Sequence, residues 1–162
     1  VARLLGANAT AVTRTPEHHQ RLRDVGATLA ITADDETSLT PVDVVIELVG
    51  AAHLEAVQAI LAPRARIVVI GVGSGARAQI DLRRVMTLRA TLTGSTLRAR
   101  SREEKTEVTE RACATLADAW SRGVLRVPVA RTFDVAEAAA AYEYFSRPGK
   151  FGKVVLVVDA AP

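Results

Sequence analysis

The segment Val42–Leu48 (VDVVIEL) decides the fold class of this chain. It is a nearly continuous apolar run, and a second run of the same kind, Arg66–Gly71 (RIVVIG), follows after one stretch with helical spacing. Apolar runs without polar alternation are typical of parallel strands that helices cover on both faces. We therefore expect both segments to be strands at the centre of a parallel sheet.

Short β-branched runs and longer stretches with helical spacing alternate along the whole chain, which predicts α/β units on a parallel sheet. No repeat or linker interrupts this pattern, so we expect one domain over residues 1–162. The predicted strands are Ala9–Thr13, Leu29–Thr32, Val42–Leu48, Arg66–Gly71, Thr91–Leu97 and Lys153–Val158. The predicted helices are Pro16–Val25, Ala52–Leu61, Ser101–Arg122 and Val135–Phe145.

The helix predicted at Ser101–Arg122 carries its apolar residues on one side. They follow a roughly helical spacing, which predicts that this side faces the core. The residues of this stripe are Val108, Cys113, Leu116 and Trp120.

The composition disfavours several classes of function. Of the 162 residues, 49% are hydrophobic and 24% charged, which suits a folded domain. The 21 basic and 18 acidic residues are spread over nearly every segment, which argues against nucleic-acid binding. No apolar run reaches the roughly 18 residues of a membrane span, and no targeting signal is recognised. Cys113 is the single cysteine, so we expect no internal disulfide and a reduced, cytoplasmic setting.

The segment 71–76 (GVGSGA) matches the dinucleotide-binding pattern G-x-G-x-x-G/A directly after a strand. That motif needs a helix that begins at once, because the helix N-terminal amides face the pyrophosphate. The following residues 77–81 (RAQID) have no helical pattern, and no acidic residue ends the next strand. We therefore favour a plain Gly-rich turn here.

A more informative position is the end of the first predicted strand, at Thr13 and Arg14. In a dinucleotide site an Asp or Glu at this place would bind the ribose hydroxyls of NAD, whereas a small hydroxyl residue followed by Arg suits the 2′-phosphate of NADP. The pair therefore predicts an NADP preference, with an ordinary surface turn as the alternative.

Two polar residues near the predicted strand 42–48 need separate interpretation. Glu47 lies in an apolar strand, where an unpaired carboxylate is unfavourable, so we expect a hydrogen bond at the strand end. His53 follows near a helix start, and we interpret it as a surface residue.

The order of these pieces resembles the C-terminal part of the medium-chain dehydrogenase/reductase superfamily, and within it the zinc-independent NADPH:quinone oxidoreductases. The motifs that carry the resemblance are VARLLGA at 1–7, VGA at 25–27, DVVIELVG at 43–50, RIVVIG at 66–71, GSTLRAR at 94–100 and GKVVLV at 152–157. The resemblance implies a Rossmann fold, a doubly wound parallel sheet of strand order 3-2-1-4-5-6. It also implies that the first strand and its Gly-rich loop, together with an N-terminal GroES-like catalytic domain, lie outside this chain, which therefore looks truncated.

The resemblance further implies where the coenzyme would lie. Thr13, Arg14 and His18 would surround the 2′-phosphate, and Val49 and Gly50 would border the adenosine and pyrophosphate path. Gly71, Val72 and Gly73 would pass close to the nicotinamide. Gly94, Ser95 and Thr96 would approach its carboxamide, and Lys153 would reach the coenzyme region. No catalytic residue and no metal ligand are identified in this chain.

The function implied by the resemblance is hydride transfer from NADPH to a quinone or another electron-poor carbonyl or alkene. The protein supplies binding and orientation in such reactions, because the coenzyme carries the hydride. We expect the 162 residues alone to be inactive and the full protein to form a homodimer through strand 91–97, which has no charge or proline to protect an open edge. The alternatives are a zinc alcohol dehydrogenase, a polyketide enoyl reductase and a non-catalytic NADP-binding or dimerisation module.

Overall fold

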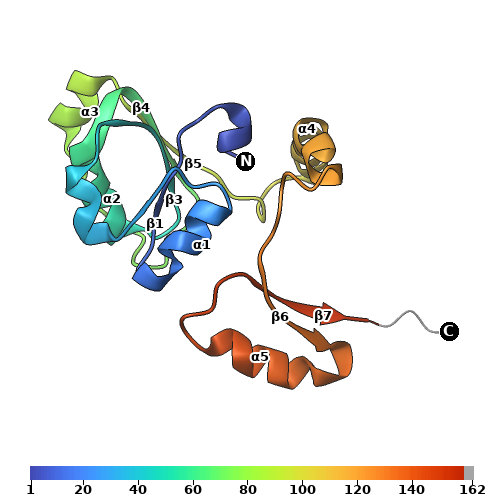
Figure 1. Cartoon of the computed structure of the whole chain (residues 1–162). Helices are drawn as coiled ribbons and strands as arrows, with labels where there is room; N and C mark the ends of the chain where they lie inside the picture. Colours follow the sequence, from blue (N-terminus) through green and yellow to red (C-terminus); the bar gives the residue numbers. More distant parts are fainter. Residues whose placement is uncertain (159–162) are drawn as a thin grey trace.

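The computed structural model describes residues 1–158 and shows an α/β fold in which every strand pair is parallel (Figure 1). The strands are β1 (Thr10–Val12), β2 (Leu29–Ile31), β3 (Val42–Glu47), β4 (Leu61–Val69), β5 (Thr91–Gly94), β6 (Val129–Asp134) and β7 (Lys153–Val157). The α-helices are α1 (His19–Asp24), α2 (Ala51–Val57), α3 (Leu82–Leu88), α4 (Arg102–Ser121) and α5 (Ala138–Ser146). Five 3₁₀ helices join them: η1 (Arg3–Leu5), η2 (Pro16–His18), η3 (Ala33–Ser38), η4 (Gln58–Ile60) and η5 (Val135–Glu137). The predicted α/β class with parallel pairing is confirmed.

The described strands form three separate sheets. Their orders are β1-β2, β3-β4-β5 and β6-β7. Strand β4 is therefore central, as predicted, but β3 lies at a sheet edge, and its prediction as a central strand is wrong for the described part of the chain. The alternate β3 residues Val44 and Ile46, and Leu48 after them, are 45%, 57% and 63% exposed because no described element covers that face.

The main core lies on the other face of β3 and β4. There α2 and η4 pack against the sheet, because their apolar residues recur with helical spacing and face inward. The buried cluster consists of Val45, Leu54, Val57, Ile60, Leu61, Ala65 and Ile67. This core fixes the carboxyl ends of β3 and β4 relative to the start of α2.

A second unit is formed by β6, α5 and β7, which Figure 1 shows apart from the sheet of β3, β4 and β5. Phe133 and Ala141 are its buried residues. One strand and one α-helix had no counterpart in the predictions. They are β6 and α3, which follows the capping residue Asp81 and has only seven residues.

Helix α4 confirms one prediction and overturns another. Its range agrees with the helix predicted at Ser101–Arg122, and the hydroxyl of Ser101 caps its start by accepting from the Glu104 amide at 3.2 Å. Its apolar stripe, however, does not face a core: Val108 and Trp120 are 37% and 59% exposed, and Cys113 is exposed. The helix stands away from the sheets in Figure 1, and Ala119 is its buried residue within the described chain.

Candidate functional site

The turns that follow β3 and β4 pack directly against each other. The Gly71 amide donates to the carbonyl oxygen of Glu47 at 3.1 Å, and the Ser74 amide donates to that of Val49 at 2.7 Å. The Ala51 amide donates to the carbonyl oxygen of Gly75 at 3.0 Å. Because β3 and β4 are parallel neighbours, their carboxyl ends meet at one sheet edge, where open α/β sheets bind their ligands.

Two glycines make this close packing possible. A Cβ at Gly71 would overlap the carbonyl oxygen of Leu48. Gly50 has φ +113°, and a Cβ there would lie 2.8 Å from the carbonyl oxygen of Gly75. A Cβ at Gly73, by contrast, would meet only the Val49 oxygen, at 3.7 Å, so this glycine has open space beside it.

Residues 71–81 form a turn and an extended connection, and the next helix, α3, begins at Leu82. The prediction of a plain Gly-rich turn is therefore confirmed. The backbone geometry that places helix amides against a pyrophosphate is missing from this turn.

Three hydrogen-bonded side chains, Glu36, His53 and Glu47, lie next to the turn that follows β3. Glu47 is fully buried, and its Oε1 accepts hydrogen bonds from the amides of Val49 at 2.6 Å and Gly50 at 2.8 Å. Its Oε2 pairs with Nδ1 of His53, whose Nε2 pairs with Oε1 of Glu36 at 2.8 Å. The predicted strand-end hydrogen bond of Glu47 is confirmed, and the prediction of His53 as a surface residue is wrong.

Neither Glu36 nor the bridging role of His53 was predicted from the sequence. Glu36 is 4% exposed and lies in η3, whose polar sequence 33–38 (ADDETS) gives no sign of burial. A usable signal was the spacing of Glu47 and His53. A helix that starts at Ala51 places its third residue next to the strand end that it has just left.

The protonation of this chain follows from its contacts. Burial alone would lower the pKa of His53, but its hydrogen bonds to Glu47 and Glu36 outweigh burial and raise that pKa above its ordinary value. Burial alone would raise the pKa of Glu47, but the Gly50 amide, His53 and the Val49 amide together hold it below its ordinary value. The geometry therefore favours a charged imidazole between two carboxylates.

These directions predict how stability depends on pH. The raised pKa of His53 gives a stabilisation that is complete below its unfolded-state pKa and disappears as the pH rises through its folded-state pKa. The lowered pKa of Glu47 gives a stabilisation that is present above its unfolded-state pKa and disappears on acidification. We expect the free energy of unfolding in urea to be greatest between about pH 5 and about pH 6. In His53→Gln the alkaline decline should be smaller, and an equal decline would contradict the assignment.

The residues predicted to bind the 2′-phosphate lie after β1, in the β1-β2 sheet. Thr13 donates its amide to Ile31 at 3.0 Å, and its hydroxyl accepts from the Thr15 amide at 3.1 Å. Arg14 is exposed and has no hydrogen bond or ion pair with any residue from 1 to 158. His18 is engaged elsewhere: its Nε2 lies 3.1 Å from the Gly149 carbonyl oxygen.

The residues predicted near the carboxamide follow β5. Gly94 is the register partner of Val69, the last residue of β4, and the Ser95 amide donates to the Val69 carbonyl oxygen at 3.0 Å. The guanidinium of Arg100 also contacts this segment, because it donates to the Thr96 carbonyl oxygen at 3.1 Å. The structure thus brings residues 94–96 beside the turn after β4.

Eight of the twelve predicted site residues lie close together, in the turns that follow β3 and β4 and in the segment 94–96. Hydrogen bonds between the turns join Val49 and Gly50 to residues 71–73, and the pairing of β4 with β5 brings 94–96 next to them. Thr13, Arg14 and His18 belong to the separate β1-β2 part. Lys153 starts β7 and pairs with β6, so it lies outside the sheet that carries the turns.

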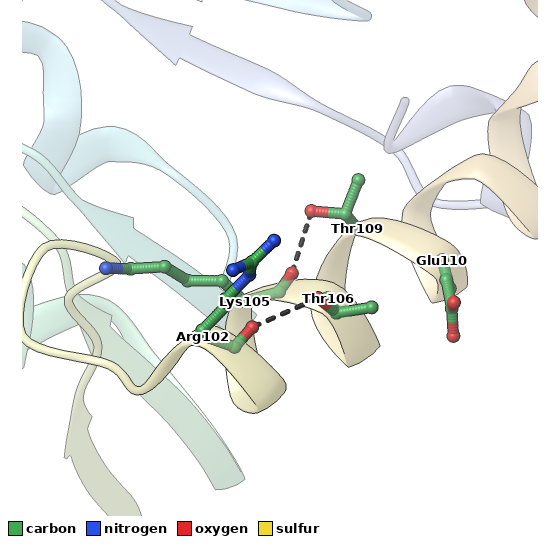
Figure 2. A pocket seen from close by; sticks show the side chains of 5 residues that line it. All are labelled: Arg102, Lys105, Thr106, Thr109 and Glu110. Atoms are coloured by element: carbon green, nitrogen blue, oxygen red, sulfur yellow. Dashed lines mark hydrogen bonds between the residues drawn. The ribbon is translucent and has the colours of Figure 1, made fainter.

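A shallow hollow lies on the surface of α4 (Figure 2). All of its lining residues come from that one helix: Arg102, Lys105, Thr106, Thr109 and Glu110. The hydroxyls of Thr106 and Thr109 donate to carbonyl oxygens of their own helix, at 3.1 Å and 2.8 Å. With no second element to enclose a ligand, this hollow carries no functional argument.

The parallel α/β fold, with glycine turns packed at the carboxyl ends of its strands, is that of the Rossmann-like C-terminal domain of medium-chain dehydrogenases. A family model described as zinc-binding dehydrogenase matches residues 10–156, so the chain belongs to that family. No curated protein matched the sequence.

Solved structures agree with this assignment. A quinone oxidoreductase from Thermus thermophilus, also solved with NADPH, is 30% identical, with a TM-score of 0.80 over 96% of this chain and 51% of its own. A 2-haloacrylate reductase is 29% identical, with a TM-score of 0.76 over 98% and 52%. A thermostable alcohol dehydrogenase from Pyrobaculum aerophilum is 25% identical, with a TM-score of 0.75 over 96% and 44%. The chain therefore spans about half the length of these relatives.

Two further findings concern metals and membranes. Within residues 1–158, no three His, Cys, Asp or Glu side chains are arranged to hold a metal ion. No helix of the described chain is long and apolar enough to cross a membrane.

Proposed function

We propose that this chain binds NADP(H) as the coenzyme-binding domain of a zinc-independent oxidoreductase that reduces a quinone or another electron-poor carbonyl or alkene. The observation that carries the coenzyme choice is Arg14, an exposed guanidinium with no partner among residues 1–158, directly after Thr13 at the carboxyl end of β1. A guanidinium can bind a phosphate through two parallel hydrogen bonds, and an uncharged Thr13 does not repel it. The bound coenzyme would supply the hydride.

The turns after β3 and β4 fit a coenzyme by shape more than by their amides. The amides of Val49 and Gly50 are already bound to Glu47, and those of Gly71 and Ser74 are bound within the two turns. What remains is the open space beside Gly73, where the backbone can approach a flat ring closely. We therefore assign residues 71–73 the role of a wall for the nicotinamide, and residues 94–96 the neighbouring wall.

The choice of electron acceptor rests on the comparisons. The Thermus thermophilus structure named a quinone oxidoreductase is 30% identical to this chain, and it was solved with NADPH. We assign no reacting group of the acceptor site to this chain, which spans about half the length of that relative. The exposed free thiol of Cys113 suits a reducing, cytoplasmic compartment.

The experiment that tests the coenzyme choice uses Arg14→Ala in the full-length protein. Loss of a charge-assisted hydrogen bond worth about 1.5–3 kcal/mol should reduce NADPH affinity about 10- to 100-fold. Affinity for NADH, which lacks the 2′-phosphate, should change less than about twofold. Both affinities are measured by quenching of protein fluorescence. Arg23→Ala is the matched control, because Arg23 is an exposed arginine that bonds only Gln20 on its own helix. Equal affinities for NADPH and NADH in the wild type would refute the proposal.

A zinc alcohol dehydrogenase is the second candidate, because the matching family model is named for zinc binding and the Pyrobaculum aerophilum structure is an alcohol dehydrogenase. Elemental analysis of the purified full-length protein separates the two candidates. About one zinc per chain, together with NAD(P)-dependent oxidation of a small alcohol, would favour this second function over quinone reduction.

We also propose a homodimer through the open edge of β5. All four residues of β5 are exposed, and β5 pairs with β4 on one side only. Because the Ser95 amide points to β4, the alternation of a strand directs the amide of Leu92 to the open edge and that of Thr93 to β4. Leu92→Pro therefore removes a hydrogen-bond donor from the seam without breaking the β4-β5 ladder.

Light scattering on the full-length protein at micromolar concentration tests this dimer. We expect a dimeric wild type and a folded, monomeric Leu92→Pro. The control Thr93→Val keeps every backbone donor and should remain dimeric. A monomeric wild type would disprove the dimer, and a folded Leu92→Pro dimer would place its interface elsewhere.

A further inference from the structure

The bridge from Glu36 through His53 to Glu47 joins parts of the chain that no strand pairing connects. Glu47 belongs to the β3-β4-β5 sheet, whereas Glu36 lies in η3, directly after β2 of the other sheet. Strand β2 in turn holds the first strand, because the Ile31 carbonyl oxygen accepts from the Thr13 amide. The imidazole of His53 is therefore a side-chain link between the sheet that carries Thr13 and the sheet that carries the glycine turns.

The carboxylates at both ends of this link, Glu36 and Glu47, are buried and lie in segments that other hydrogen bonds hold in place. Glu36 and Glu47 are 4% and 0% exposed, which is rare for carboxylates unless they are paired. η3 is fixed by its own cap, in which the amide and the hydroxyl of Thr32 both donate to the Asp35 carboxylate. At the other end Glu47 accepts hydrogen bonds from the amides of Val49 and Gly50. A shift of His53 would therefore move Glu47 and, with it, that turn.

We propose that His53 is a positioning residue for the coenzyme: by bridging Glu36 and Glu47 in its protonated form, it holds the 2′-phosphate half and the nicotinamide half of the site in register. This inference rests on the proposed function, because the two halves are those assigned to NADP(H) above. His53 itself contacts neither half. It acts through Glu47 on residues 49–50 and through Glu36 on the β2 end that supports Thr13.

Protonation matters because two ionised carboxylates can only accept hydrogen bonds, so both ring nitrogens must donate. A neutral imidazole keeps one N–H and loses one of the two contacts. The charged groups that act on His53 are Glu36 from η3 and Glu47 from β3. Glu55, on the same helix α2, accepts from the Gln79 amide at 3.0 Å and is engaged there. Glu36 has no other side-chain partner within the described chain, and its Oε2 is buried without a hydrogen bond. Loss of His53 would therefore leave the Glu36 carboxylate without a side-chain hydrogen bond.

The test compares two ligands that occupy different parts of the proposed coenzyme site. NADPH extends over both halves of the site, whereas adenosine 2′,5′-bisphosphate occupies the 2′-phosphate half alone. Affinities are measured by calorimetry on the full-length protein at about pH 6 and about pH 9, because the raised pKa of His53 favours its protonated form at the lower pH. The variants are His53→Leu, which removes both donors, His53→Gln, which keeps one amide donor, and the control Glu55→Gln. Circular dichroism verifies that each variant is folded.

For the wild type we expect NADPH affinity to fall about tenfold from the lower to the higher pH, the usual size of a coupling between two sites. His53→Gln should start about tenfold weaker at about pH 6 and show no further fall, while the bisphosphate binds within about twofold of wild type. His53→Leu, if folded, should behave in the same way, and Glu55→Gln should match the wild type.

The outcomes separate this inference from the proposed function. If the wild type binds NADPH and His53→Gln binds it equally well with the same pH profile, the positioning role is overturned and the proposed function stands. If His53→Gln weakens both ligands equally, His53 supports one half only and the link between the halves is also overturned. If the wild type binds no NADPH, the proposed function fails and takes this inference with it.

Discussion

Gly71→Ala should destabilise the protein by about 3 kcal/mol, the upper part of the range for overpacked positions. The added Cβ would overlap the carbonyl oxygen of Leu48, and its nearest neighbours are backbone atoms that cannot rotate away. The turn after β3 is itself fixed by the bonds of Glu47 to Val49 and Gly50, so it has little freedom to move. For a chain of this size the melting temperature should fall by about 6–12 °C.

Gly73→Ala is the matched control, because a Cβ there meets only the Val49 oxygen at an ordinary van der Waals distance of 3.7 Å. Its unfolding free energy should stay within about 0.5 kcal/mol of wild type. Calorimetric melting of the three proteins provides the comparison. Equal melting temperatures for Gly71→Ala and wild type would contradict the tight packing of the two turns. If Gly73 also borders the nicotinamide, as proposed, its alanine variant should bind NADPH more weakly while melting normally.

The glycines illustrate what the sequence could predict. The pattern G-x-G after an apolar strand indicated a turn at the carboxyl end of β4, and the absence of a helical pattern in 77–81 correctly excluded the dinucleotide fingerprint. The reason for Gly71 was not readable, because its neighbour is the backbone of Leu48, 23 residues away in the sequence. Distances across a sheet edge depend on strand register, and a one-dimensional pattern does not contain register.

The same limit explains the incorrect predictions. Local periodicity located α4, but it cannot show whether an apolar stripe packs against another element, and here Trp120 is exposed. Residues 129–134 (VARTFD) show no strict alternation of apolar and polar residues, and their last residue, Asp134, is a helix cap, so β6 was not predicted. Local patterns thus predicted the fold class and most elements, whereas tertiary contacts determined which strands are central.

Removal of the buried Glu47 carboxylate should also have a large effect on the free energy of unfolding. Glu47→Ala should lower the free energy of unfolding by about 3–5 kcal/mol, because removing one member of a buried ion pair leaves its partners unsatisfied. Those partners are the ring nitrogen of His53 and the amides of Val49 and Gly50. Since domains of this size are stable by only about 5–15 kcal/mol, the variant should unfold at a much lower urea concentration.

Glu47→Gln separates the charge of Glu47 from its hydrogen bonds. The amide oxygen of glutamine can still accept from both backbone amides, and its NH₂ can donate to Nδ1 of a neutral His53. We therefore expect a smaller loss of about 1–2 kcal/mol, and a His53 ring that no longer needs two protons. Urea denaturation followed by circular dichroism measures both losses, and the ¹⁵N chemical shifts of the ring nitrogens report the protonation of His53. An alanine variant as stable as the glutamine variant would mean that the amides of Val49 and Gly50 gain nothing from this side chain, and the buried bridge would then not hold the turn.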